Sequence, residues 1–251
     1  MNDFYDGPFV YDNPIDNNNN NNTLSTTEIK NEHLTPSSPD TYNWVSPNSA
    51  ESIELEERGE LGSSIFTVAN VFTDAQCDIM VDYILKHSAL WDEKAVGSET
   101  KNNVKCKYLT LKDMVSSNIP CSKELDDLIF KSVGKLLVKI RERNPAFNGT
   151  QDNGYTLRKI YGGTKRHIDG VHSKTSGFKN FVRCLSIIIV LNDDYDGGVF
   201  CFPNQGLKFR VQKGQAILFP PYWTHPHSVT SVSEGQARYT INTWILEKFI
   251  D

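Results

Sequence analysis

The sequence predicts an α+β fold, mainly β, in which helices pack on one face of an antiparallel double-sheet or jelly-roll core. Two segments with helical spacing come first, and short apolar runs separated by Gly, Asn, Asp and Pro follow from Asn153 onward. Helices do not alternate with these runs, which disfavours a doubly wound parallel sheet. At 251 residues the chain has room for one sizeable domain and a tail.

Residues 1–50 are predicted to form a disordered, Asn-rich tail. They contain the run Asn17 to Asn22, which is typical of an AT-rich or viral coding genome. They also have too few apolar residues to offset the entropy cost of ordering. Residues 51–251 are predicted to form one domain, with a helical part at 63–145 and a jelly-roll core at 153–248.

The helical part begins with an expected strand over residues 65–72 that leads into a capping box. Thr73 is followed three residues later by Gln76, and apolar positions at helical spacing predict a helix over 74–88. Residues 96–103 are polar and are expected to form a mobile loop, before an edge strand over 104–111. A second, long helix is expected from Ser122 until shortly before Pro145.

Six short strands are expected after the helices, at 155–161, 183–191, 198–202, 207–211, 215–219 and 238–246. The run 185–191 is apolar on both faces. This pattern indicates a strand that lies between the helices and the interior of the barrel.

Composition excludes several classes of protein. The formal net charge of -5 gives no general attraction to nucleic acid or to an anionic membrane. The N-terminus has no signal-peptide pattern, and no window approaches the length of about 18 apolar residues that a membrane span needs. The five cysteines form no CxxC pair, which indicates reduced thiols. A cytoplasmic protein is therefore expected, without a nucleic-acid or membrane partner; its oligomeric state is not indicated.

The chemistry-bearing pattern is His167-Ile168-Asp169, which in an extended segment projects an imidazole and a carboxylate from the same face. A third metal ligand would come from His225 or His227, and both have the same parity on an extended segment. Two His and one carboxylate on one face of an octahedron leave three positions open, which is typical of non-haem Fe(II) oxygenases. Taken alone, His-x-Asp favours an ordinary strand edge over a metal site.

A second polar face is expected on the last strand. Arg238, Thr240, Asn242 and Trp244 share one side of it by alternation. If this side points inward, the buried guanidinium requires a carboxylate partner and indicates an anionic ligand. The alternative is that Arg238 pairs with an acid at the surface.

Over residues 155–246 these elements resemble the prolyl 4-hydroxylase-like family of Fe(II)/2-oxoglutarate-dependent oxygenases. The resemblance rests on an ordered series of motifs: Tyr161, His167-Ile168-Asp169, Arg183, Leu191-Asn192-Asp193, Gly197-Gly198, Lys213-Gly214, Phe219-Pro220, His227, Gly235, Arg238 and Trp244.

The resemblance implies a double-stranded β-helix, the cupin-like jelly roll, with His167, Asp169 and His227 as iron ligands. It favours His227 over His225 as the third ligand. It also implies that Arg238 binds the distal carboxylate of 2-oxoglutarate.

The sequence departs from the family pattern in two places. Val190 replaces a tyrosine that often lies near the cosubstrate, so Tyr161 or Thr240 would donate to the cosubstrate instead. The spacing from His227 to Arg238 is longer than usual, and we expect a one-residue bulge near Gln236.

The activity that the resemblance implies is hydroxylation of a protein or peptide side chain, first of all proline at C4, with release of succinate and CO2. Its requirements would be Fe(II), 2-oxoglutarate and O2, with ascorbate as a reductant, and the loop at 96–107 would cover the peptide. The alternatives are hydroxylation of a free amino acid, a small metabolite or peptidyl lysine, and a non-catalytic cupin-like binding module.

Overall fold

The computed structural model describes residues 42, 53–90, 106–170 and 181–248. The expected tail, apart from Tyr42, lies outside these residues, and so does the loop at 96–103. Within the described ranges, the chain contains no helix with the length and apolar content needed to cross a membrane.

The helices follow the sequence pattern closely. The structure confirms the capping box of Thr73 and Gln76 at the start of the first helix. The Thr73 side chain accepts from the Gln76 backbone N–H, and the Gln76 side chain accepts from the Thr73 backbone N–H. The helical segments are α1 (Asp74–Lys86), the 3-10 turn Ser88–Leu90, α2 (Leu111–Ser116), α3 (Ser122–Arg143) and the 3-10 turn Pro203–Gln205.

Eight strands form the larger sheet, which is antiparallel throughout. They are β1 (Leu55–Glu57), β2 (Phe66–Val68), β3 (Cys106–Thr110), β4 (Gln151–Asp152), β5 (Thr156–Ile160), β7 (Phe181–Val190), β10 (Ala216–Phe219) and β12 (Arg238–Lys248). Their order is β1-β2-β10-β7-β12-β5-β3, and β4 pairs with the far end of β12. β3 lies at the edge of this sheet, as predicted.

A second antiparallel sheet has the order β6-β11-β8-β9. Its strands are β6 (Thr164–His167), β8 (Phe200–Phe202), β9 (Leu207–Phe209) and β11 (His227–Val229). The prediction of a mainly β fold with two antiparallel sheets is therefore confirmed.

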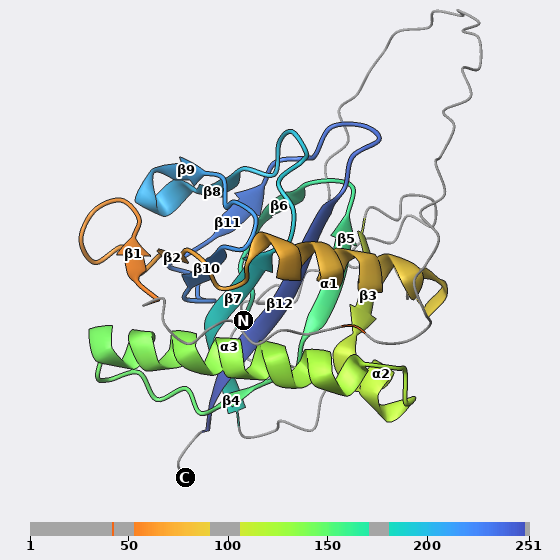
Figure 1. Cartoon of the computed structure of the whole chain (residues 1–251). Coiled ribbons are helices and arrows are strands. Elements are labelled where there is room, and N and C mark those ends of the chain that lie inside the picture. Colours follow the sequence, from red (N-terminus) through yellow and green to blue (C-terminus); the bar gives the residue numbers. More distant parts are fainter. Residues whose placement is uncertain (1–41, 43–52, 91–105, 171–180, 249–251) are drawn as a thin grey trace, which may run out of the picture.

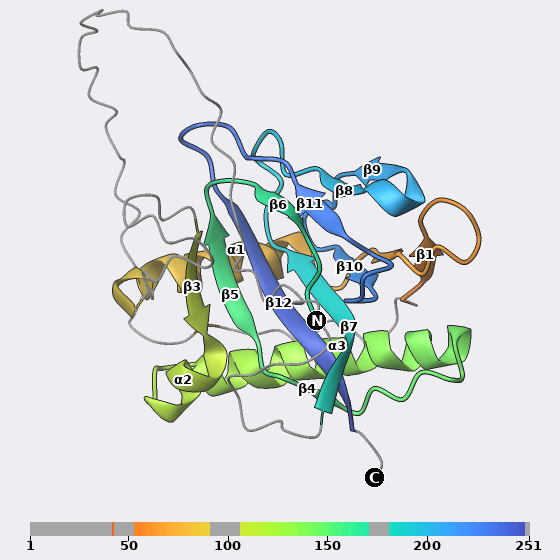
Figure 2. The same ribbon diagram turned by 180° about the vertical axis from the view of Figure 1, so that it is seen from behind.

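The larger sheet has two buried faces. In Figures 1 and 2, α1 and α3 cross the larger sheet on the same side. Buried residues of both helices, such as Met80 and Ile129, belong to one hydrophobic cluster with Ile187, Ile241 and other sheet residues. A second cluster lies on the other face of β7 and β10 and joins them to the smaller sheet: Ile65, Val190, Phe200, Phe202, Val211, Ile217, Phe219 and Val229.

Several short elements differ from the sequence expectations. β1, β4, β6, β11 and α2 were not predicted, because segments of two to six residues are too short to show a period. Val71 and Phe72 lie outside β2, and Gln236 precedes β12 in a loop, so the extra residue before Arg238 is not a bulge within a strand. Tyr42, in the expected tail, packs edge-on against Tyr83 of α1 with ring centroids 5.0 Å apart.

Candidate metal centre

Two histidines face each other where β6 and β11 pair. His167 is the last residue of β6 and His227 the first of β11, and the two are direct backbone partners. Their ring centroids are 4.4 Å apart. Antiparallel pairing places directly opposed side chains on the same face of a sheet, which explains how residues 60 positions apart in the chain come together.

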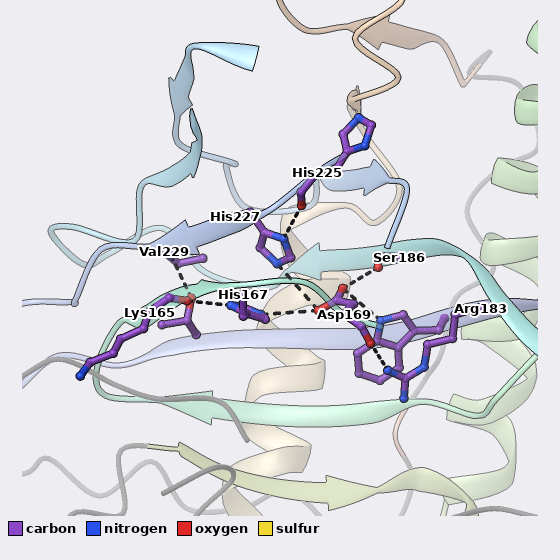
Figure 3. A network of polar contacts seen from close by, with 10 residues as sticks. Lys165, His167, Asp169, Arg183, Ser186, His225, His227 and Val229 are labelled. Atoms are coloured by element: carbon purple, nitrogen blue, oxygen red, sulfur yellow. Dashed lines mark hydrogen bonds and ion pairs between the residues drawn. The ribbon is translucent and has the colours of Figure 1, made fainter. Parts of the chain in front are cut away.

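Asp169 completes the group. Its Oδ1 atom lies 3.5 Å from His167 Nε2 and 3.8 Å from His227 Nε2. One donor atom from each of the three residues lies within 4.8 Å of the other two, and Figure 3 shows the three side chains converging. The structure thus brings together the three residues that the sequence pattern singled out.

The hydrogen bonds of the two imidazoles orient their Nε2 atoms toward this point. His167 Nδ1 lies 2.7 Å from the carbonyl oxygen of Lys165, and His227 Nδ1 lies 3.2 Å from that of His225. A carbonyl oxygen can only accept, so each Nδ1 carries a proton, and in the neutral form of each ring the lone pair is then on Nε2. This is the tautomer that metal-ligating histidines adopt.

The electrostatics of the group also suit a cation. Burial opposes ionisation of Asp169, but its contacts with His167 and His227 outweigh burial and hold the pKa of the carboxyl below its usual range. Burial lowers the pKa of His227 to about 4. Asp169 is therefore ionised and His227 is uncharged near neutral pH. These are the forms in which the two side chains bind a metal ion, because ligands bind when deprotonated.

Asp169 is fixed by residues that the sequence analysis did not single out together. Its Oδ2 atom accepts from Ser186 Oγ at 2.5 Å and from Trp244 Nε1 at 3.1 Å. Arg183 donates to the Asp169 carbonyl oxygen, and its guanidinium carbon lies 4.1 Å from the centroid of the Trp244 ring. Ser186 could have been suspected, because it interrupts the apolar run 185–191.

His225, the rival third ligand, points away from the group (Figure 3). Its Nε2 lies 2.7 Å from the Ser63 carbonyl oxygen, and its Nδ1 lies 2.8 Å from Thr224 Oγ1. The structure therefore groups His227, and not His225, with His167 and Asp169. His225 still contributes through its backbone, since its carbonyl oxygen holds the His227 ring.

The expected cosubstrate residues divide between two faces of the sheet. Arg238 and Thr240 are buried on β12. Their alternation with Tyr239 and Ile241, which face the helices, directs both toward the side of the sheet that carries Trp244. The Arg238 guanidinium lies 5.3 Å from the Phe200 ring, and Thr240 Oγ1 donates to Asn242 Oδ1.

Tyr161 lies elsewhere. It is 39% exposed, and the Lys159 ammonium lies over its ring. Lys159 also lies over Tyr239, which belongs to the helix-facing side of the sheet. This placement does not bring Tyr161 to the same face as Arg238 and Thr240.

The donor set fits a first-row divalent metal that accepts nitrogen and oxygen ligands. Two imidazole nitrogens and one carboxylate oxygen in a compact group are the ligands associated with Fe(II) oxygenases, and they leave further coordination positions to other molecules. Among the described residues, no other group of His, Cys, Asp and Glu meets the geometry of such a site.

Known proteins agree with this chemistry. Residues 155–246 match the model of the 2OG-Fe(II) oxygenase superfamily. A protein of Acanthamoeba polyphaga mimivirus named "Putative prolyl 4-hydroxylase" is 23% identical over 199 residues, which cover 73% of this chain and 74% of that protein.

Solved structures share the fold. The viral collagen prolyl hydroxylase of Paramecium Bursaria Chlorella virus-1, in its 2OG complex, aligns with a TM-score of 0.55 at 16% identity and covers 75% of this chain and 98% of that one. A Trichoplax adhaerens prolyl hydroxylase, in complex with a hypoxia inducible factor peptide fragment, gives the same TM-score and identity over 74% of this chain and 84% of that one. The match over residues 155–246 supports a 2-oxoglutarate-dependent dioxygenase, and the solved structures show that the chain shares the fold of these prolyl hydroxylases.

Proposed function

We propose that His167, Asp169 and His227 hold Fe(II), and that the enzyme hydroxylates proline at C4 in a protein or peptide. The observation that carries the proposal is the convergence of three donor atoms, two from imidazoles and one from a carboxylate, within 4.8 Å of one another. The matches to proteins named as prolyl hydroxylases, one of them solved with a peptide, support the substrate class.

Arg238 is the proposed anchor of the cosubstrate. A guanidinium binds a carboxylate through two parallel hydrogen bonds, and burial strengthens this pairing. Arg238 is 3% exposed and begins the same face of β12 whose Trp244 contacts Asp169. Thr240 lies two residues further along this face and is the second proposed cosubstrate residue. Its hydroxyl donates to Asn242 Oδ1 and would have to turn in order to donate to the ligand.

The reaction consumes one O2 and one 2-oxoglutarate for each substrate. One oxygen atom enters the C–H bond as a hydroxyl group and the other enters succinate, while the 1-carboxylate leaves as CO2. The iron, when bound, supplies the oxidising chemistry, and the protein supplies orientation and exclusion of water. Phe202 and Phe219 pack against the His227 ring, with centroids 5.5 and 4.6 Å away, and keep this side of the centre apolar.

The experiment is a turnover assay with Fe(II), 2-oxoglutarate, ascorbate and O2. Proline-containing peptides, lysine-containing peptides and free amino acids are tested in parallel, and both succinate and a mass gain of about 16 Da are measured. We expect both signals with a proline peptide, and neither with the Asp169→Ala variant. A mass gain only on lysine peptides or free amino acids would refute the substrate class but keep the oxygenase. Absence of succinate under all conditions would refute the proposal.

A further inference from the structure

The two carboxylate oxygens of Asp169 have different surroundings. Oδ1 faces His167 Nε2 and His227 Nε2, whereas Oδ2 is directed away from them and accepts two hydrogen bonds from Ser186 and Trp244. Two donors on one oxygen occupy the lone pairs that Oδ2 would otherwise offer to a metal ion.

The two donors form a rigid pair. Ser186 of β7 and Trp244 of β12 are direct backbone partners in the larger sheet, so their side chains emerge side by side on the same face. Both are buried, with 1% and 8% exposure. Asp169, in contrast, lies beyond the end of β6 in a segment without regular structure. The sheet therefore supplies the fixed geometry, and the carboxylate adapts to it.

Arg183 connects the parts of this arrangement. Its guanidinium donates to the backbone carbonyl oxygen of Asp169 and lies 4.1 Å from the centroid of the Trp244 ring, at a distance suited to stacking. One side chain thus restrains both the main chain of Asp169 and the indole that donates to its carboxylate.

We propose that Ser186 and Trp244 are positioning residues that hold Oδ2 and so restrict Asp169 to a single metal-binding oxygen, Oδ1. Carboxylates can bind metals through one oxygen or through both. An Asp169 free to turn could present both oxygens and occupy a position that the two-point binding of 2-oxoglutarate needs. This inference rests on the proposed function, because it presupposes that Asp169 is a metal ligand.

The simpler reading is that the two hydrogen bonds only satisfy a buried carboxylate, as buried polar groups require. Both readings predict that losing the donors weakens the site. They differ in the coordination of the bound metal, which changes only if the donors determine how many oxygens Asp169 presents.

The test uses the full chain with Co(II) under anaerobic conditions, because the visible spectrum of Co(II) reports its coordination. The variants are Ser186→Ala, Trp244→Phe and the double variant. Ser132→Ala is the control for Ser186→Ala, because Ser132 is also buried and its hydroxyl donates within α3. Trp223→Phe is the control for Trp244→Phe, and it makes the same substitution at an exposed tryptophan. Co(II) affinity, the Co(II) spectrum and 2-oxoglutarate affinity of the Co(II)-loaded protein are measured, with thermal unfolding of every variant.

We expect each single variant to bind Co(II) about 10- to 100-fold more weakly, as is typical when a partner of a metal ligand is lost. The double variant should also show an altered Co(II) spectrum and weaker 2-oxoglutarate binding, while both controls match the wild type. An unchanged spectrum and unchanged 2-oxoglutarate affinity in the variants would overturn the inference. If the double variant does not fold, the Co(II) spectra of the two single variants decide: a spectrum altered in either of them supports the inference, and a spectrum unchanged in both overturns it. Failure of the wild type to bind Co(II) would instead count against the proposed function.

Discussion

His167 and His227 are backbone partners across β6 and β11, and their Nε2 atoms lie 3.5 and 3.8 Å from Asp169 Oδ1. The pairing of two very short strands thus determines where the candidate metal would be held. It also separates His227 from His225, although the two share parity in the sequence.

Replacing His227 and replacing His225 should therefore have different effects. His227→Ala removes a proposed ligand and should abolish Fe(II)-dependent formation of succinate. His225→Ala removes a hydrogen bond to Ser63 and leaves the three donors in place, so turnover should stay within about 100-fold of the wild type. Succinate formation and Fe(II) affinity are the measurements. An inactive His225→Ala beside an active His227→Ala would refute the assignment.

Arg238→Ala should weaken 2-oxoglutarate binding much more than Fe(II) binding. Truncating one partner of a buried charge pair costs about 2 kcal/mol or more, which corresponds to a loss of roughly 30-fold in affinity. Calorimetric titration of each ligand measures the two effects separately. Arg141→Ala is a matched control. This arginine lies in the last turn of α3 and donates to the Gly149 carbonyl oxygen, outside the proposed site. Equal losses for the metal and the cosubstrate would show that Arg238 is structural.

The metal-free protein should become less stable in acid because of His227. Its pKa is about 4 in the folded protein and about 6.5 in the unfolded chain, so the unfolded state binds more protons between these values. The free energy of unfolding should be unaffected above pH 6.5, fall as the pH drops through this window, and lose up to roughly 3 kcal/mol below pH 4. Urea unfolding at a series of pH values measures it. His227→Gln should flatten the slope, and an identical slope in this variant would contradict the assignment.

The effect of deleting N-terminal residues on stability should depend on whether Tyr42 is kept, because Tyr42 packs on α1. We propose that residues 51–251 suffice for metal binding. A chain that begins at Asp40 should be as stable as the full chain, and one that begins at Glu51 should lose about 1 kcal/mol with the aromatic contact to Tyr83. Thermal unfolding and Fe(II) affinity check both chains. Tyr42→Ala in the full chain should reproduce the loss, and an unfolded shorter chain would refute the boundary.

The sequence predicted the long elements and the ligand types well because these depend on local patterns. The capping box at Thr73 and the helix from Ser122 are set by residues a few positions apart. The paired His167 and Asp169 have the spacing of a chelate in any extended segment. Each of these features could be interpreted without knowing which strands are neighbours.

What the sequence did not reveal depends on strand pairing. Ser186 and Trp244 meet only because β7 and β12 adopt one register, 58 positions apart. His225 is committed to Ser63, 162 positions earlier, which no local pattern indicates. Tyr161 lies with Lys159, as alternation along the chain places it, whereas the residue opposite Arg238 is Ile160. The expectation for Tyr161 came from the family resemblance, which does not indicate the face on which this side chain lies.

β12 alternates without interruption from Arg238 to Trp244, so these two side chains lie on the same face of the sheet. An insertion or deletion of one residue between them would place them on opposite faces. The register of β12 with β7 shifts only after Ile245, beyond both residues. Loss of a single residue between Arg238 and Trp244 would turn one of them to the helix-facing side and disconnect it from the other. The segment between β11 and β12 is not held in strand register, although Thr230 and Ser233 make backbone hydrogen bonds to the segment 196–199. A change of chain length there need not alter which side Arg238 faces, whereas a change between Arg238 and Trp244 must separate the two side chains.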